Sequence, residues 1–451
     1  MRLAVIIFLS LLLSGICSGA VLRVDAGGEA DYSSIQEGIN ASRDGDVIEV
    51  KAGVYVGSIN FYGKAITVRS TEPEDSNTVA STVIRRERKL PSSVVRFDCG
   101  EGKRTVLRGF TVESVGDAEG TGYGIYCHYS SPVISDMVIL GCMTGVRGEY
   151  GTPLVRNSYI GGNSFSGVEI RGGEVLNCTV NDNGLYGFYN CRSNVVRCEV
   201  SGNKGMGFYD CKGSVINCLI AANGGGLRDC GAYIGNCTIV HNVRSSGLHG
   251  CHEEICNSII AFNGEYGLNN CRGVIKYNNV WENVLGSYAG GTIPGVRDIH
   301  GDPLFAGEGD YHVKSEGGRW DCAAGVWFLD EVTSPSVDAG GNYCAESQVE
   351  AEPCGGRINQ GVYGGTLEAS KTPNGESLCV AEATSEGEWI FGKLAIDDLA
   401  ANGYYWYKVN SKSEVSLEEW IGNAVWTDCK GTGSKGERSK KCVIGSGIGP
   451  K

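Results

Sequence analysis

The amino-acid sequence predicts an all-β solenoid, in which short coils stack as a parallel β-helix. Three columns of residues with a period of about 20 positions indicate this fold. The first column is an asparagine, at Asn163, Asn183, Asn203, Asn223, Asn242, Asn263 and Asn283. The second stands five positions earlier, at Ser158, Cys178, Cys198, Cys218, Cys237, Ser258 and Asn278. The third comprises Arg171, Cys191, Cys211, Cys230, Cys251 and Cys271.

Each coil contains pieces that are typical of β-strands. Apolar doublets such as Val175-Leu176 and Val195-Val196 alternate with short runs such as Cys218-Leu219-Ile220, and turn-forming residues separate them. Short β-branched runs bounded by Gly, Asn, Ser and Asp favour strands. A coil of this length holds two or three such strands. The sequence lacks the Leu-x-x-Leu-x-Leu frame that a leucine-rich repeat of similar period would need.

The repeated columns are predicted to be scaffold. Coils in parallel register lie about 4.8 Å apart, so equivalent asparagines can form an internal ladder of side-chain amides. The same spacing is wider than the separation of about 3.5–4.5 Å between Cβ atoms that a disulfide prefers. We therefore expect the column cysteines to be small buried apolar fillers. Off the columns, Cys344 with Cys354 and Cys429 with Cys442 are candidate disulfides. No Cys-x-x-Cys occurs, and no metal site is expected.

Residues 1–20 have the features of a secretory signal peptide. An arginine precedes an apolar run, and small residues at Ser18 and Ala20 precede a cleavage site before Val21. Cys17 suggests a lipoprotein, but Ile16 stands where a small residue would be expected. No later segment is apolar enough to span a bilayer. We expect a secreted or cell-surface protein.

Residues 21–60 predict an N-terminal cap. Ser34 and Glu37 fit a capping box, Ile35 and Ile39 share one face of a short helix, and Gly45 can end it. Such a helix would cover the open end of a solenoid. The segment resembles the start of pectin-lyase-like β-helix proteins, through Gly45, Asp46, Ile48, Val50, Gly53 and Tyr55. The resemblance implies a right-handed helix with three sheets per coil.

The later part of the chain predicts a closing segment and a separate region. Regular coils are expected over 137–291 and a closing segment over 292–371, so that the β-helix spans 21–371. Two stretches, 301–321 and 334–371, resemble the closing segment of secreted β-helix proteins from planctomycete-type bacteria. The matching pieces are Asp302 to Phe305, Asp338 to Gly340, Gly355 to Asn359 and Tyr363 to Gly365. Residues 372–451 predict a small domain with an aromatic core or a sugar-stacking module, followed by a flexible basic tail.

Candidate functional residues lie beside the third column. If its cysteines point inward, their neighbours point outward, and Arg192, Lys212, His252 and Arg272 line one face. Asp210 and Asp229 stand next to them, and Tyr189 and Tyr209 precede the cysteines by two positions. Cations and aromatic faces in a line suit an anionic polysaccharide. A net charge of −13 argues against a nucleic-acid partner.

These residues are compatible with three functions. The favoured one is binding of an extracellular polysaccharide or cell-surface glycan without catalysis, by a monomer without a cofactor. The alternative is a polysaccharide lyase, with Lys212 or Arg192 as the base and Arg272 or a bound calcium neutralising a uronic carboxylate. A third is a structural spacer or adhesin, with binding left to 372–451. A glycoside hydrolase would need two converging carboxylates, and the sequence does not predict such a pair.

Overall fold

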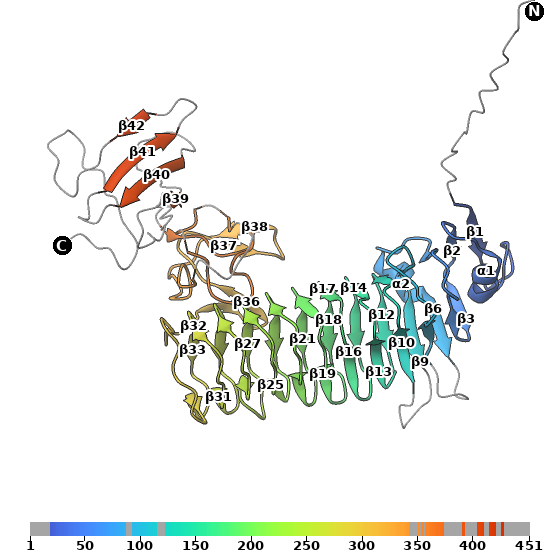
Figure 1. Ribbon diagram of the computed structural model, residues 1–451, viewed down its shortest axis with the longest axis horizontal. Helices are drawn as coiled ribbons and strands as arrows, with labels where there is room; N and C mark the ends of the chain where they lie inside the picture. The colour runs from blue at the N-terminus through green and yellow to red at the C-terminus, as the bar shows by residue number, and fades with distance from the viewer. Residues whose placement is uncertain are drawn as a thin grey trace, which may run out of the picture.

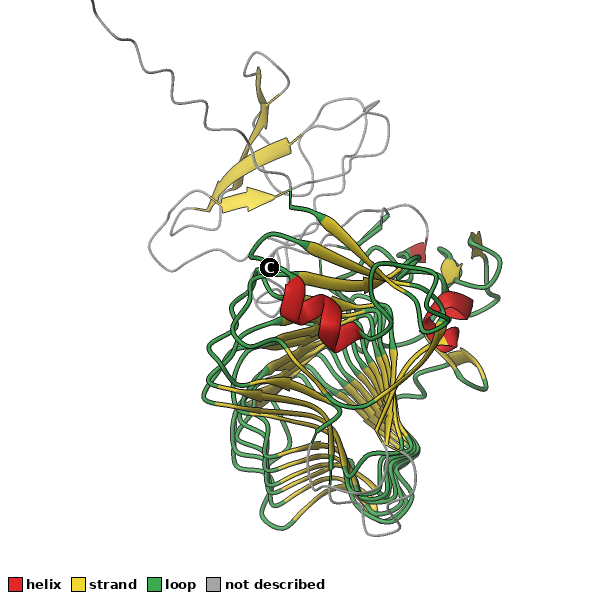
Figure 2. Cartoon of the chain, turned by 90° about the vertical axis from the view of Figure 1, so that its right-hand side faces the viewer, coloured by secondary structure: helices red, strands yellow, loops and turns green. Residues whose placement is uncertain are grey.

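The computed structural model describes residues 19–86, 93–114, 122–341, 350–351, 353–355 and 357–373, and four further strands in the C-terminal region. Three parallel sheets run the length of the solenoid, and each coil adds one strand to each sheet (Figures 1 and 2). The predicted fold class is confirmed, including the N-terminal capping helix. The signal peptide up to residue 18, Cys344, Cys429, Cys442 and the basic tail lie outside the described residues.

The three sheets, named here A, B and C in the order in which the chain visits them, contain 12, 11 and 11 strands. The strands of sheet A are β1 (Val21–Val24), β2 (Val47–Val50), β5 (Thr67–Ser70), β8 (Val106–Arg108), β11 (Val133–Ser135), β14 (Leu154–Arg156), β17 (Glu174–Leu176), β20 (Asn194–Val196), β23 (Val215–Ile216), β26 (Ile234–Gly235), β29 (Ile255–Cys256) and β32 (Ile275–Lys276).

The strands of sheet B are β3 (Gly53–Val56), β6 (Thr82–Arg86), β9 (Thr111–Ser114), β12 (Val138–Leu140), β15 (Tyr159–Gly161), β18 (Thr179–Asn181), β21 (Glu199–Ser201), β24 (Leu219–Ala221), β27 (Thr238–Val240), β30 (Ile259–Ala261) and β33 (Asn279–Trp281). Those of sheet C are β4 (Ile59–Asn60), β7 (Val95–Phe97), β10 (Tyr123–His128), β13 (Thr144–Glu149), β16 (Ser166–Ile170), β19 (Tyr186–Tyr189), β22 (Met206–Tyr209), β25 (Gly225–Arg228), β28 (Leu248–His249), β31 (Tyr266–Asn269) and β34 (Gly286–Ala289).

The remaining elements lie outside these three sheets. They are the helices α1 (Ile35–Ala41) and α2 (Ser76–Ser81) and the antiparallel pairs β35 (Phe305–Gly307) with β36 (Asp310–Val313) and β37 (Arg319–Asp321) with β38 (Val326–Phe328). A four-stranded antiparallel sheet comprises β39 (Ile390–Gly392), β40 (Tyr404–Val409), β41 (Val415–Trp420) and β42 (Val425–Thr427). Among the described residues, no helix is long and apolar enough to cross a membrane.

The core is a stack of identical or similar side chains inside the coils. Val175, Val195 and Val215 pair in register in sheet A and are almost fully buried. In sheet C, the Phe188 and Phe208 rings stack with centroids 4.6 Å apart. Strand residues alternate between the two faces of a sheet, so the residues between these point outward. The alternation fixes which side chains of each coil are available to a ligand.

The predicted asparagine ladder is confirmed. Asn183 Nδ2 donates to Asn203 Oδ1 at 2.9 Å, and Asn203 Nδ2 donates to Asn223 Oδ1 at 2.8 Å. The same amide also donates to a backbone carbonyl, as Asn203 Nδ2 does to Val180 O at 3.1 Å. Equivalent bonds join the ladder from Asn163 to Asn283. Each asparagine satisfies turn backbone that would otherwise be buried without a partner.

The column cysteines are buried free thiols, as expected, but they also form hydrogen bonds. Cys218 Sγ donates to Ile216 O at 3.3 Å, just as Ser258 Oγ donates to Cys256 O at 2.9 Å. Cys198 Sγ accepts from the backbone N–H of Cys178 at 3.4 Å. The thiols therefore replace serine as weak donors and acceptors at these turns and are more than apolar fillers.

Helix α1 covers the N-terminal end of the solenoid (Figure 1). Its capping box is formed by Ser34 and Glu37, and Ile35 and Ile39 are buried against the first coil. Lys64 Nζ donates to three carbonyls at the end of the helix, Ile39 O, Asn40 O and Ser42 O, at 2.5–2.9 Å. A cation at this position satisfies the unpaired carbonyls and complements the helix dipole.

Val296 and Ile299 still pair in parallel with Lys276 and Asn279 of the last coil, and the described residues of the closing segment that follow, from about 305 to 371, pack on the outer face of sheet B. Ala221, Val240, Ile259 and Ala261 point outward there yet are buried, because Phe305, Tyr311, Val313 and Val337 cover them. Turn asparagines hold the segment by its backbone, and Asn217 Nδ2 donates to Val362 O at 2.8 Å and to Gly364 O at 2.9 Å. None of these four covered residues belongs to sheet C or to the turn that leads from sheet C to sheet A.

Candidate functional site

The four basic residues predicted to share a face lie on the turn that leads from sheet C to sheet A. We call Arg192, Lys212, His252 and Arg272 the basic ridge. Each side chain is exposed, and each backbone N–H bonds a carbonyl of the preceding coil, as Lys212 N does to Cys191 O at 2.7 Å. Gly231 fills the coil between Lys212 and His252. The ridge is therefore a row along the solenoid axis, with coils about 4.8 Å apart.

The ridge cations are available to a ligand. Within the described residues, no hydrogen bond or ion pair engages the side chains of Arg192, Lys212 or Arg272. The His252 ring lies over Gly231, where an added Cβ would be 2.7 Å from His252 Nε2. The row extends over several coils, which suits an extended anionic partner.

The two predicted acidic residues have a structural role at the same turn. Asp210 and Asp229 have φ of 49° and 54°, in the left-handed region. The equivalent residues of other coils are Asn190, Gly250 and Asn270, which also have positive φ. Asn, Asp and Gly are the residues that tolerate this conformation best. Asp229 also lies 3.5 Å from Arg228 Nε, so its carboxylate is partly neutralised.

The two predicted tyrosines belong to a larger aromatic surface on the outer face of sheet C. Tyr189 and Tyr209 pair in register and stack with centroids 6.0 Å apart. Tyr186 stacks on both, at 5.2 Å and 5.0 Å, and Phe165 packs edge-on against Tyr186 and Tyr189. We call these four half-buried rings the aromatic platform. Burial and the neighbouring phenols raise the pKa of Tyr186.

Sequence reasoning missed two members of this surface, Phe165 and Tyr186. The signal was present, because Tyr186-Gly187-Phe188-Tyr189 aligns with Met206-Gly207-Phe208-Tyr209 at the coil period. The Tyr189 side chain stands three residues before Arg192 in the same coil. The platform and the basic ridge therefore lie side by side along the edge of sheet C.

An ion cluster that was also missed adjoins the platform on the N-terminal side. Arg147 donates to Glu149 at 2.8 Å and to Glu169 at 3.1 Å, and its guanidinium lies 5.0 Å from the centre of the Tyr123 ring. The hydrogen bond from Arg147 lowers the pKa of Glu149, whereas burial raises the pKa of Glu169. Because one guanidinium bonds to both carboxylates, the Glu149 and Glu169 side chains are held in place beside the platform.

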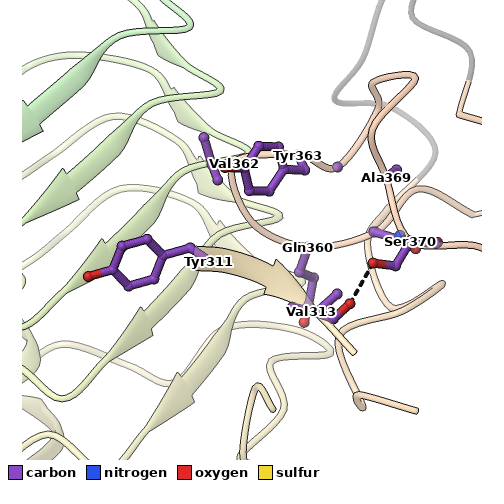
Figure 3. Close-up of a pocket in the computed structure, with 9 residues that line it drawn as sticks. Tyr311, Val313, Gln360, Val362, Tyr363, Ala369 and Ser370 are labelled. Carbon is purple, nitrogen blue, oxygen red and sulfur yellow. Dashed lines mark hydrogen bonds between the residues drawn. The ribbon is translucent and has the colours of Figure 1, made fainter. Parts of the chain in front are cut away.

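A small pocket lies elsewhere, within the packing of the closing segment. Its cavity volume is only about 10 Å³, and its lining includes Tyr311, Val313, Gln360, Tyr363 and Ser370 (Figure 3). Ser370 Oγ donates to Val313 O at 2.5 Å across it. Its lining belongs to the contacts that fix the closing segment, and it contains none of the predicted site residues.

The described residues contain no group of three or more His, Cys, Asp and Glu side chains placed to hold a metal. The predicted catalytic candidates Lys212, Arg192 and Arg272 stand on separate coils of the ridge. The calcium expected for a lyase is untested and remains a prediction.

Fold and site together define a parallel β-helix protein with an exposed basic row beside an aromatic surface. A family model described as "Disaggregatase related" matches residues 129–340, from just before β11 into the closing segment. No curated protein matches the sequence.

Several solved β-helix structures resemble the chain at low identity. The A-module of a mannuronan C-5 epimerase from Azotobacter vinelandii is 14% identical with a TM-score of 0.42, over 59% of this chain and 93% of that one. Pectate lyase Pel9A is 15% identical with a TM-score of 0.41, over 77% of this chain and 97% of that one. A tailspike from Acinetobacter phage AS12 is 11% identical with a TM-score of 0.34, over 92% of this chain and 81% of that one. The function is therefore argued from the residues of this chain.

Proposed function

We propose that the protein binds an extracellular anionic polysaccharide along the edge of sheet C, without cleaving it. The observation that carries the proposal is the unpaired cations of the basic ridge, standing in a row beside the aromatic platform. Guanidinium and ammonium groups pair with carboxylates or sulfates, and aromatic faces pack on the apolar faces of sugar rings. The bound chain lies parallel to the solenoid axis and contacts successive coils.

The negative charge of the whole molecule should confine polyanion binding to the basic ridge. With a net charge of −13, the protein as a whole repels polyanions, so a polyanion is held only where cations are locally concentrated. Binding should therefore weaken steeply as salt screens the ridge, since these cations are exposed. A neutral glucan would gain nothing from the ridge.

Binding is tested on a panel of polygalacturonate, alginate and dextran sulfate, with dextran as the neutral control. We expect binding to at least one anionic polymer, and a loss of about tenfold or more when Arg192→Ala, Lys212→Ala and Arg272→Ala are combined. The matched control combines Arg43→Ala, Arg156→Ala and Arg244→Ala, which removes three exposed cations away from the ridge residues. Equal affinity in the two triple variants would contradict the proposal.

Catalysis is tested on the same panel. Unsaturated uronic product absorbs in the ultraviolet, so lyase activity is followed directly, with and without calcium. We expect no product. Steady product formation that Lys212→Ala or Arg192→Ala abolishes would replace the proposal with the lyase.

The location of the protein outside the cell belongs to the same proposal. A signal peptide over 1–20 and a secreted or cell-surface monomer accord with a polysaccharide partner outside the cell. The resemblance of 301–321 and 334–371 to planctomycete-type proteins is likewise kept as a proposal of lineage. If 372–451 bound the panel and 21–371 did not, the solenoid would be a spacer.

A further inference from the structure

Two exposed tyrosines form a stacked pair at the turn between sheet C and sheet A. The Tyr129 and Tyr150 rings lie 4.8 Å apart and 13° from parallel, and His128 packs edge-on against both. Their exposed fractions are 62% and 66%, whereas every ring of the aromatic platform is half-buried. We call them the tyrosine pair.

The backbone of both residues is strained. Tyr129 and Tyr150 have φ of 51° and 57°, where a bulky side chain is uncommon and costs on the order of 1–3 kcal/mol. Later coils place Asn190, Asp210 or Gly250 at the corresponding end of the sheet C strand. The fold thus accepts a small residue at this turn, and nothing in its packing requires an exposed aromatic ring there.

Two other aromatic rings with the same backbone conformation, those of Phe262 and Tyr277, receive another group. The Phe262 ring packs against Phe305 of the closing segment at 6.5 Å. The Tyr277 ring lies beneath the Arg357 guanidinium at 5.3 Å. At these two left-handed turns the ring points outward from the coil, where another side chain packs against it.

The tyrosine pair stands in line with the basic ridge. Exposed Arg171 follows Tyr150 on the next coil, and Arg192 of the ridge follows on the coil after that. On the other side, exposed Lys103 and Arg104 belong to the turn that precedes Tyr129, where Ser131 N donates to Glu101 O at 2.6 Å. Cations therefore flank the pair along the same axis, and Arg171 also lies near the carboxylates of Glu149 and Glu169.

We infer that the tyrosine pair is a second sugar-stacking subsite, which extends the track of the basic ridge toward the N-terminus. The inference rests on the proposed function, because its ligand is a more distant part of the same anionic chain. A ring face of the polymer packs on the exposed tyrosine, while Arg171 and Lys103 meet the acidic groups on either side. Only chains long enough to span from the ridge to Tyr150 use this subsite.

The test measures polygalacturonate and its purified dimer-to-decamer fragments on the full chain. For Tyr129→Asn with Tyr150→Asn, we expect about tenfold weaker binding of the long chains and unchanged binding of fragments too short to span both sites. The Phe double variant should retain the long-chain affinity, since stacking does not need the hydroxyl. Phe328→Ala, another exposed aromatic, is the control.

Stability separates a binding role from a structural one. Asparagine relieves the left-handed strain, so the Asn double variant should melt at the same temperature or higher. A clear fall in its melting temperature would show that the pair serves the fold and would overturn the inference.

The outcomes separate the tyrosine subsite from the proposed binding of a polysaccharide by the basic ridge. Long-chain binding that depends on the ridge but not on the tyrosines overturns the inference alone. Equal losses for short and long fragments also overturn it, because the pair would then act on the ridge itself. No binding of any anionic polymer by the unaltered protein overturns both.

Discussion

At the scale of the residue, the asparagine ladder concentrates hydrogen bonds on single side chains. Asn223 accepts from the backbone and side chain of Asn203, and its amide donates to Val200 O and to Asn242 Oδ1. Removing this side chain leaves several buried groups without partners. We expect Asn223→Ala to lower the free energy of unfolding by about 3 kcal/mol, as measured by chemical denaturation. Asn177→Ala, at an exposed turn, is the control, and an equal loss there would contradict the ladder's role.

The buried thiols lead to a second prediction at this scale. Burial raises the pKa of the Cys218 and Cys230 thiols well above the ordinary value, so the reactive thiolate is suppressed. We expect alkylation of the native protein at neutral pH to label exposed Cys99 and Cys322, and to label the column cysteines only after unfolding. Peptide mass spectrometry without reduction is the measurement. Disulfides between column neighbours would refute it.

At the scale of the element, the closing segment depends on one buried carboxyl. Glu350 Oε1 accepts from Asn359 N and Gly365 N, both at 2.7 Å, and burial raises the pKa of this carboxyl to about 7. The folded state therefore holds the proton more tightly than the unfolded chain does. The resulting stabilisation is present at acidic pH and is lost as pH rises toward and beyond 7.

The protection factors of the amides in 357–371, which compare hydrogen exchange with the intrinsic rate at each pH, should accordingly be higher at pH 5 than at pH 8, by an amount corresponding to at most about 3 kcal/mol. Glu350→Gln should remove most of this dependence. Glu368→Gln, at an exposed position, should leave it intact. A pH dependence that survives Glu350→Gln would show that another group controls the segment.

The covered face of sheet B offers a matched pair of substitutions. Val240, Ala221 and Ser201 occupy the same outward column, but the closing segment covers only the first two. We expect Val240→Asp to cost about 3–5 kcal/mol and to expose the closing segment to protease, because the charge would be buried unpaired. Ser201→Asn should change little, since this position is only half-buried and the substitution adds no charge beside Glu199. Equal protease sensitivity in the two variants would mean that the second core is not what holds the segment.

At the scale of the whole molecule, the constant coil length made most of the fold predictable. From Asn163 to Asn283 the spacing stays within one residue, so the columns and the outward row Arg192 to Arg272 follow from the sequence. Earlier coils vary, and Val68 pairs with Leu107 across nearly two coil lengths because helix α2 is inserted between them. Register could not be carried through such insertions. Arg147, Tyr150 and Glu169 lie within the coils predicted to be regular, so they were missed although the register reached them. The left-handed turns were also hidden, because the positive φ of Asp210 and Asp229 cannot be read from the sequence.

Because the ladder is uniform, we expect the solenoid to tolerate a change in length only when a whole coil is added or removed. Deleting residues 184–203 joins Asn183 to Lys204, and it brings β16 beside β22 with every column still in phase. We expect this variant to fold with one coil fewer and with Arg192 missing from its ridge, as circular dichroism and a thermal melt would show. Deleting 184–193 instead should prevent cooperative folding, because half a coil places apolar side chains on the outside. A solenoid of this kind can thus lengthen or shorten its outward rows of side chains by duplicating or losing whole coils, while the contacts inside each coil stay the same.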